Sequence, residues 1–393
     1  MNPWRGLGRL PRELWVLAGV TLVNRAGTMV LPFLSLFLTQ ERGVGATRSG
    51  VALVAYAVGS LLSAPVSGRL ADRLSPRRVM LLSLALGGAA VLVLPLAPGL
   101  WGFVAAVFLW SALAESFRPA SLAAVTHAVR PEDRRAAFAL NRLAINLGMS
   151  LGPALGGFLS ALSFRWLFWI DAATSLAAAG LLWALGGDRR ARSTPEPAAS
   201  PEPAAERPRF AAVLDDRRFL LVLAGAVPIA AVFFQHIGAM PLHLVRDLGF
   251  SAAFYGLLFT VNTLLIVLTE VPLNLGMAHW SHRSSLVLGS LLVAVGFGAL
   301  AFARSAPAVV ATVVVWTFGE MILFPSLSAA VADLAPRGAV GAYMGHYQLA
   351  FAVAFLFGPW AGIALMDQVG PAAPWLACFA AGVLAALFFR RLR

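Results

Sequence analysis

The dominant feature of the sequence is a series of long stretches without charged side chains, separated by short polar segments. A helix needs about 20 apolar residues to cross the hydrocarbon core of a bilayer. Most of these stretches have that length, so each indicates one membrane-spanning helix. The uncharged stretches are 49–68, 79–114, 143–164, 219–245, 248–269, 284–303, 338–366 and 368–389.

Stretch 79–114 is too long for one span, and Pro95, Pro98 and Gly99 lie where a turn would divide it into a helical hairpin.

Only 12% of the residues are charged, against about a quarter in soluble domains, which fits a chain dissolved in lipid. We predict twelve spans. They lie at approximately 14–39, 49–71, 79–96, 101–128, 137–162, 165–186, 219–244, 250–275, 284–303, 307–333, 339–366 and 371–389.

The basic residues, all of them Arg, cluster in alternate segments between the spans, beginning with the N-terminal one. A net charge of +12 can indicate nucleic acid, but this alternation marks membrane topology instead, and we expect no nucleic-acid partner. It predicts a bacterial inner-membrane protein with both termini in the cytoplasm. The segments expected on the opposite side hold only Arg42, Arg48, Arg165, Arg246 and Arg304.

A polar segment rich in Pro, Glu and Ala, 187–216, divides the chain into two parts, 1–186 and 217–393. Such a composition cannot build a core and indicates a cytoplasmic linker. The two parts repeat each other at a nearly constant shift, so that Trp110 and Pro119 correspond to Trp316 and Pro325. This duplication predicts an all-α membrane protein of twelve transmembrane helices in two pseudo-symmetric six-helix halves. In transporters, such repeats place the substrate near the midplane between the halves.

Segment 68–80, GRLADRLSPRRVM, resembles the signature G-x-L-A-D-R-x-G-R-R found between helices 2 and 3 of the major facilitator superfamily. Ser75 and Pro76 depart from it, which affects the turn but leaves the charges. The resemblance implies that Asp72 accepts hydrogen bonds at the start of helix 11, near Gly338. The alternative is an Arg cluster that only stops translocation. The motif residues are Gly68, Leu70, Ala71, Asp72, Arg73, Arg77 and Arg78.

Segment 148–157, GMSLGPALGG, resembles the antiporter signature G-x-x-x-G-P-x-x-G-G of the same superfamily. Small residues in this spacing let another helix approach closely, and Pro153 bends its own helix. In the family, this signature accompanies export more than uptake. Ordinary small-residue packing is the alternative. The signature residues are Gly148, Gly152, Pro153, Gly156 and Gly157.

Three further strings narrow the resemblance: NRAGTMVLPFL from Asn24, ESFRPA from Glu115 and GEMILFP from Gly319. Together they resemble the lactococcal-type multidrug exporters in the drug:proton antiporter branch. The resemblance covers nearly the whole chain.

Ionisable residues inside the spans are candidates for proton chemistry, because a charge at the bilayer centre costs about 2.5–3.5 kcal/mol. Glu320 has no basic residue within one helical turn in the sequence, so we predict that it carries the coupling proton, with Glu115 as the second candidate. Glu115 and Arg118 face the same way on one helix and can pair. The intramembrane ionisable residues are Arg25, Glu115, Arg118, Arg142, Asp171, Glu270 and Glu320.

Asp171 and Glu270 lie nearer to the expected span ends, so a solvated or packing role is equally open for each. Arg142 lies close enough to the cytoplasmic end to snorkel. We also expect a substrate cavity lined by aromatic and amide side chains, which suits bulky apolar or amphipathic ligands, although aromatic residues in spans often face lipid or core. The expected cavity residues are Arg25, Arg118, Phe233, Gln235, Asn262, Tyr347 and Gln348.

The sequence has no phosphate-binding loop, metal-ligand spacing, catalytic triad order or dinucleotide fingerprint, so we expect neither an enzyme nor a cofactor or metal. We predict a monomeric secondary transporter in contact with membrane lipids that exports small apolar or amphipathic compounds in exchange for protons. The alternatives are a proton-coupled importer of a nutrient or peptide, and a lipid flippase or non-transporting receptor on the same fold.

Overall fold

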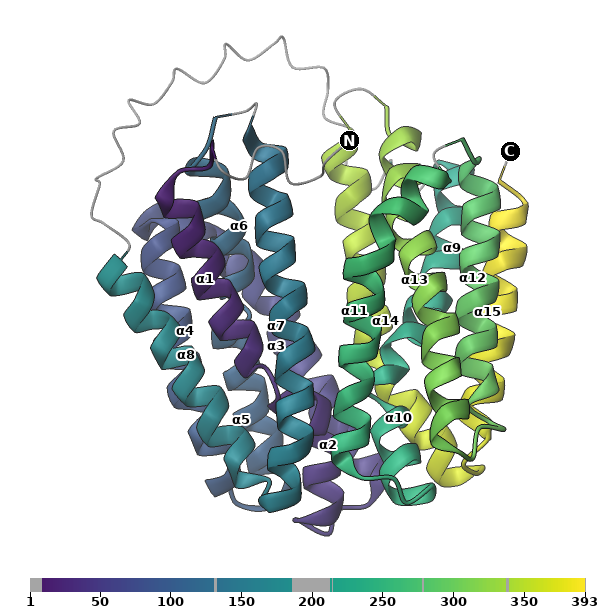
Figure 1. The fold of residues 1–393 in the computed structure, drawn as a ribbon, viewed down its shortest axis with the longest axis horizontal. Coiled ribbons are helices and arrows are strands. Elements are labelled where there is room, and N and C mark those ends of the chain that lie inside the picture. The colour runs from purple at the N-terminus through teal and green to yellow at the C-terminus, as the bar shows by residue number, and fades with distance from the viewer. Residues whose placement is uncertain are drawn as a thin grey trace. The chain divides into compact units, whose positions relative to one another are not determined.

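The computed structural model describes residues 9–130, 133–185, 213, 215–277, 279–336 and 339–392. At residues 64, 68, 71, 72, 134 and 135 it describes the backbone only. Over these described residues the regular secondary structure is all helical. Most of the predicted linker 187–216 lies outside the described residues. Within them, 12 helical segments are long and apolar enough to cross a membrane (Figure 1). The prediction of an all-α fold with twelve spans is thereby confirmed.

The first six spans comprise eight α-helices, because two of the spans are interrupted. The predicted hairpin in 79–114 is confirmed: Gly99 has φ +59° between two helices, a conformation that glycine adopts without strain. The helices are α1 (Arg12–Gly27), α2 (Val30–Gln40), α3 (Ala46–Leu74), α4 (Pro76–Val93), α5 (Gly99–Ala114), α6 (Phe117–His127), α7 (Arg134–Leu162) and α8 (Arg165–Leu185).

The last six spans begin with another interrupted one, in which α9 is followed by a 3-10 turn (Phe234–His236), the short α10 and a π-helix (His243–Asp247). The other five spans are single helices. The helices are α9 (Arg217–Phe233), α10 (Ala239–Leu242), α11 (Ala252–Gly276), α12 (His282–Ala299), α13 (Ala306–Leu334), α14 (Val340–Gln368) and α15 (Ala373–Arg390).

Two of the interruptions follow from proline. A proline has no N–H for the carbonyl four residues earlier, which is residue 28 for Pro32 and residue 115 for Pro119. The helical pattern stops at these places, between α1 and α2 and between α5 and α6. Irregular backbone at membrane depth is tolerated where it is buried in protein or lines a cavity, so both breaks are candidate functional positions.

The described residues form two compact units. The first contains those of 1–186, 235–267 and 359–371, and the second those of 187–234, 268–358 and 372–393. In the first unit, α1 packs against α7 and α8, α3 against α5, and α4 against α8. In the second unit, α12 packs against α13 and α15, and α15 against α9. The division into pseudo-symmetric halves 1–186 and 217–393 stays a prediction from the duplication.

Candidate functional site

A small polar cavity lies among the spans of the first unit. Its volume of about 30 Å³ leaves room for about two water molecules, whereas sites for small-molecule ligands measure roughly 300–1,000 Å³. It therefore suits protons and water but not a substrate. The polar residues that line it are Asn24, Arg25, Thr28, Tyr56, Ser83, Glu115, Asp171 and Ser175.

Glu115 lies in this cavity at the break between α5 and α6. The buried Tyr56 of α3 donates a hydrogen bond from Oη to Glu115 Oε1 at 2.7 Å. The pair considered from the sequence was Glu115 with Arg118, but Arg118 is exposed. Glu115 is thus held across helices, by a tyrosine that the sequence reasoning did not consider.

Asp171 of α8 lines the same cavity and is only 5% exposed. It faces the backbone N–H groups of Met29 and Val30 at the start of α2 and the guanidinium of Arg25. The solvated role that its sequence position left open is therefore wrong, because depth along a helix does not determine burial. The side chain lies directly beside the break between α1 and α2.

The glycines of the 148–157 string pack against that same break. A Cβ atom at Gly148 would lie 2.5 Å from Arg25 Cβ, and one at Gly152 would lie 3.0 Å from the Thr28 carbonyl oxygen. A Cβ at Gly156 would be 2.9 Å from the Cβ of Met29, which precedes α2. Real Cβ atoms are rarely found so close to other atoms, so glycine lets α7 lie directly on the interrupted span.

The opposite side of α7 is equally close to α11. A Cβ at Gly157 would lie 2.5 Å from the Ala252 carbonyl oxygen, and one at Gly256 would overlap the Pro153 carbonyl oxygen. Thr260 also donates a hydrogen bond to the Ser150 carbonyl at 3.2 Å. The string thus places α7 between the α1–α2 break and the first part of α11.

The loop motif is described only in part. Only the backbone is described at Gly68 and Asp72, so the predicted contact of Asp72 with the start of α14 stays a prediction. Arg73 and Arg78 are exposed. Arg77 donates to two backbone carbonyls in the last turns of α8, each at 3.2 Å, which anchors the loop to its own unit.

In the second unit, aromatic side chains of α9, α13 and α14 form a continuous cluster. The ring of Phe324 lies 5.0 Å from that of Phe233 and 5.5 Å from that of Phe351, which is 4.9 Å from Tyr347. Glu320 lies one helical turn before Phe324 on α13 and is half-buried. The predicted proton carrier is therefore on the helix that carries the centre of the cluster.

The remaining predicted cavity residues have varied positions. Gln235 is only 4% exposed; its Oε1 accepts the Ala239 N–H at 3.4 Å, and a Cβ at Gly362 would overlap it. It is closely packed against Gly362 and the start of α10. Asn262 is half-buried and Gln348 exposed. Since the predicted residues belong to both units, their common cavity stays a prediction.

The other intramembrane charges, Arg142 and Glu270, are not among the residues that line the polar cavity. Arg142 is exposed on α7, in keeping with the snorkelling position expected from the sequence. Glu270 is half-buried on α11, and Asn274 donates to its backbone carbonyl at 2.9 Å. Their roles stay open.

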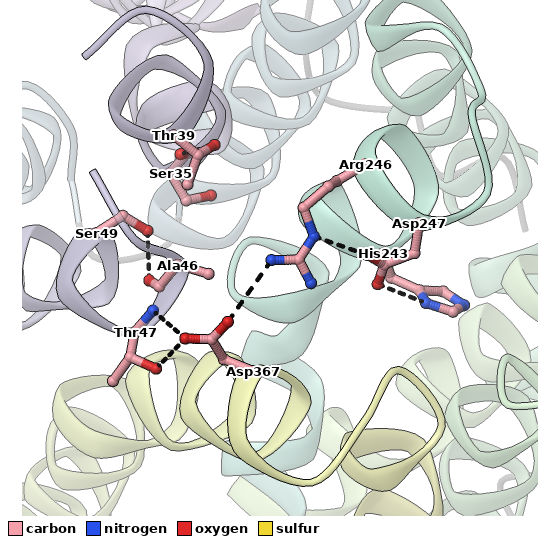
Figure 2. Close-up of polar contacts among 9 residues, drawn as sticks. All are labelled: Ser35, Thr39, Ala46, Thr47, Ser49, His243, Arg246, Asp247 and Asp367. Atoms are coloured by element: carbon pink, nitrogen blue, oxygen red, sulfur yellow. Dashed lines mark hydrogen bonds and ion pairs between the residues drawn. The ribbon is translucent and has the colours of Figure 1, made fainter. Parts of the chain in front are cut away.

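A second polar network joins the start of α3 to the end of α14 (Figure 2). Asp367 Oδ2 accepts from Thr47 Oγ1 at 2.7 Å and from its N–H at 3.3 Å. Arg246 bridges Asp367 at 4.0 Å and Asp247 at 2.7 Å, and His243 Nδ1 lies 3.5 Å from Asp247 Oδ2. All five residues belong to the first unit.

Sequence reasoning did not identify this network, because it took Arg246 only as a topology signal. The two acids near span ends, Asp247 and Asp367, would have been the clue. For the cavity, the clue was Tyr56, since the chain has only four tyrosines and this one lies within a span.

Comparisons with known proteins agree with this architecture. The family model of the Major Facilitator Superfamily matches residues 16–243 and 225–393. The uncharacterized MFS-type transporter YqjV of Bacillus subtilis is 26% identical over 381 residues, covering 95% of this chain and 90% of the relative. The multidrug resistance protein MdtH of Aeromonas salmonicida is 27% identical over 390 residues, covering 96% and 94%.

Among solved structures, that of a peptide transporter POT in complex with sulfate has a TM-score of 0.79 at 15% identity, covering 99% of this chain and 97% of the other. This likeness concerns the fold alone. Because the family model covers nearly the whole chain, and twelve spans have the expected length and composition, the chain is a multi-pass membrane transporter that belongs to the Major Facilitator Superfamily.

Proposed function

We propose that this transporter exports small apolar or amphipathic compounds in exchange for protons, by alternating access. The observation that carries the proposal is the polar cavity that both Glu115, at the α5–α6 break, and Asp171, beside the α1–α2 break, line. Carboxyl groups inside a membrane span are costly and mark ion or proton pathways. A cavity with room for water only is suited to move protons and not substrate.

Export is favoured over import by the 148–157 string. Its resemblance to the antiporter signature covers every defined position, and its glycines hold α7 against the interrupted span 1 on one side and α11 on the other. The similarity to multidrug resistance proteins MdtH supports the same direction. We place the protein, as a monomer, in the bacterial cytoplasmic membrane with both termini in the cytoplasm.

The aromatic cluster supports the substrate class. Phe233, Phe324, Phe351 and Tyr347 present ring faces and edges with few charges nearby on the same helices, which suits planar or apolar compounds. Glu320 and Glu115 are the candidate proton carriers. One proton that moves inward through 100 mV supplies about 2.3 kcal/mol, enough for roughly 50-fold accumulation.

Transport in proteoliposomes would test the proposal. With the purified protein reconstituted and an acid interior imposed, we expect ethidium to accumulate inside vesicles through inside-out molecules, and accumulation to collapse when a protonophore dissipates the gradient. Peptide or nutrient uptake driven in the same direction as proton flow would instead support import. Movement of a labelled phospholipid without gradient dependence would support a flippase. Transport of no tested compound at any gradient would overturn the proposal.

A further inference from the structure

We infer that Asp171 binds a coupling proton and that its charged form holds the start of α2 in place. The inference rests on the proposed proton coupling and adds a residue and a mechanical consequence to it. Glu320 and Glu115 were the carboxyls expected from the sequence, whereas the structure also brings Asp171 to the polar cavity, beside the break between α1 and α2.

The first argument is the environment of the carboxyl oxygens. Asp171 Oδ2 is buried and has no hydrogen-bond partner among the described residues. A charged oxygen left in this state incurs the full loss of its hydration. Binding a proton removes that charge, and the adjoining cavity is large enough for the water that would deliver the proton.

The second argument is that neighbouring N–H groups and a positive charge favour the charged form of Asp171, in opposition to its burial. The N–H groups of Met29 and Val30 belong to the start of α2, where the helix dipole favours an anion, and Arg25 adds a full positive charge. The other titratable groups lining the cavity are Tyr56 and Glu115, which are hydrogen-bonded to each other. Because burial opposes the charge and these donors support it, the carboxyl can change state when the surroundings move.

The third argument connects this change to movement. When Asp171 is charged, α8 is tied to the start of α2, and Gly27 lies so close to Thr174 of α8 that a Cβ there would overlap it. When the carboxyl is neutral, it loses the charge that strengthens its interaction with the N–H groups at the start of α2, so the tie to α2 is weakened. The glycines of α7 lie on this same break, so a shift of α2 changes the surface on which α7 rests.

Proton binding can be measured without any substrate. Infrared difference spectra of the purified protein between roughly pH 5 and pH 9 should show the carbonyl band of a buried protonated carboxyl. We expect that band to disappear in Asp171→Asn and to persist in the control Glu41→Gln, which removes an exposed acid from the end of α2. A band that is unchanged in Asp171→Asn would overturn the inference.

Coupling is measured with ethidium in proteoliposomes. Asp171→Asn should lose gradient-driven accumulation at least tenfold while exchange down the ethidium gradient persists, and Asp171→Glu should recover part of it. If wild type shows no gradient-driven transport, the proposed function fails and the infrared result stands by itself. If wild type is coupled and Asp171→Asn is equally coupled, the inference fails and the proposed function stands. Monodispersity in detergent and exchange activity show whether the variant is folded.

Discussion

Tyr56 and Glu115 join two membrane-spanning segments through a hydrogen bond that the tyrosine hydroxyl donates to the carboxyl group. The bond joins residues 59 positions apart at 2.7 Å, and the tyrosine ring also packs edge-on against Trp110 at 5.3 Å. A hydrogen bond to a charged partner is stronger than one between neutral groups. Tyr56 is therefore expected to fix the position of Glu115, and the stability lost when Tyr56 is replaced should depend on the charge of Glu115.

Replacing Tyr56 with Phe should lower stability by about 1.5–3 kcal/mol if Glu115 is ionised, and by about 1 kcal/mol if it is neutral. We expect most of this effect to be lost when Glu115→Leu is already present, because leucine cannot accept the hydrogen bond. Thermal unfolding of the two single variants and the double variant in detergent measures this coupling. Additive shifts in the melting temperature would show that the bond contributes no specific stabilisation.

Glu320 lies on a helix whose neighbouring residues are apolar, beside the aromatic cluster. Because glutamine resembles a permanently protonated glutamate, Glu320→Gln should lose transport against a gradient but still exchange substrate down its own gradient. If Glu320 is the dominant titrating group, the affinity for ethidium should also become independent of pH between roughly 6 and 8. Gradient-driven transport at the wild-type rate would exclude Glu320 as proton carrier and leave Glu115 and Asp171.

Among the helices, the duplicated prolines behave differently in the two parts of the sequence. Pro119 coincides with a break after α5, whereas the corresponding Pro325 lies inside the continuous α13. A proline leaves the carbonyl four residues earlier without its helical partner, and for Pro325 this is Met321. Asn274 donates to the Met321 carbonyl at 3.4 Å. The side chain of Asn274, from α11, thus bonds the freed carbonyl of α13, which stays continuous. At the corresponding place in the first part of the chain, the helix is broken between α5 and α6.

This contrast shows what the sequence can and cannot predict. Apolar length gave the twelve spans and the hairpin in 79–114, since both depend on local composition. It did not give the breaks at Thr28 and Glu115, because prolines also occur within unbroken helices, such as Pro65 and Pro153. At Pro325 the difference lies in the side chain of Asn274, which comes from another helix and meets the freed carbonyl.

The same limit applied to the site. Asp171 was placed by its distance from a span end, and Gln235 by its polarity, but burial is set by the neighbouring helices. Asp171 turned out to line the polar cavity, and Gln235 to fill a gap against Gly362. By contrast, the glycine string was recognisable from spacing alone, because close approach requires small residues at every turn.

Adding a side chain at Gly152 should impair transport, since a Cβ there would lie about 3 Å from three carbonyl oxygens of the interrupted span. We expect Gly152→Leu to reduce transport at least tenfold while ethidium binding is retained. Gly180→Leu is the matched control, because a Cβ at Gly180 of α8 meets no atom within 4 Å. If both variants transport normally, the string serves only ordinary packing.

For the whole molecule, the network in Figure 2 joins segments from the beginning and the end of the chain. Thr47 comes from the predicted first half, whereas Arg246 and Asp367 come from the second. Any alternation in which the two halves separate at this end must break the two bonds between Thr47 and Asp367. A hydrogen bond contributes about 0.5–1.5 kcal/mol, so the bonds between Thr47 and Asp367 can bias a conformational equilibrium without locking it.

Asp367→Ala should shift that equilibrium up to about fivefold toward the form in which α3 and α14 are apart at this end. Spin labels at Arg48 and Val369, both exposed, would report the change as a larger population of long distances. Asp333→Ala removes an exposed acid paired with His282 in the second unit and serves as control. An unchanged distance distribution in Asp367→Ala would show that the network has no influence on the equilibrium.

The position of Arg25 has a consequence for how the protein is made. Asn24 beside it bonds Ser175, which is 151 positions later in the chain, and Asp171 is equally late. At about 5–20 residues per second, the ribosome needs roughly 8–30 s to produce that partner region. During this time the first span carries a charge at membrane depth without the carboxyl of α8, so its stable insertion depends on helices that do not yet exist.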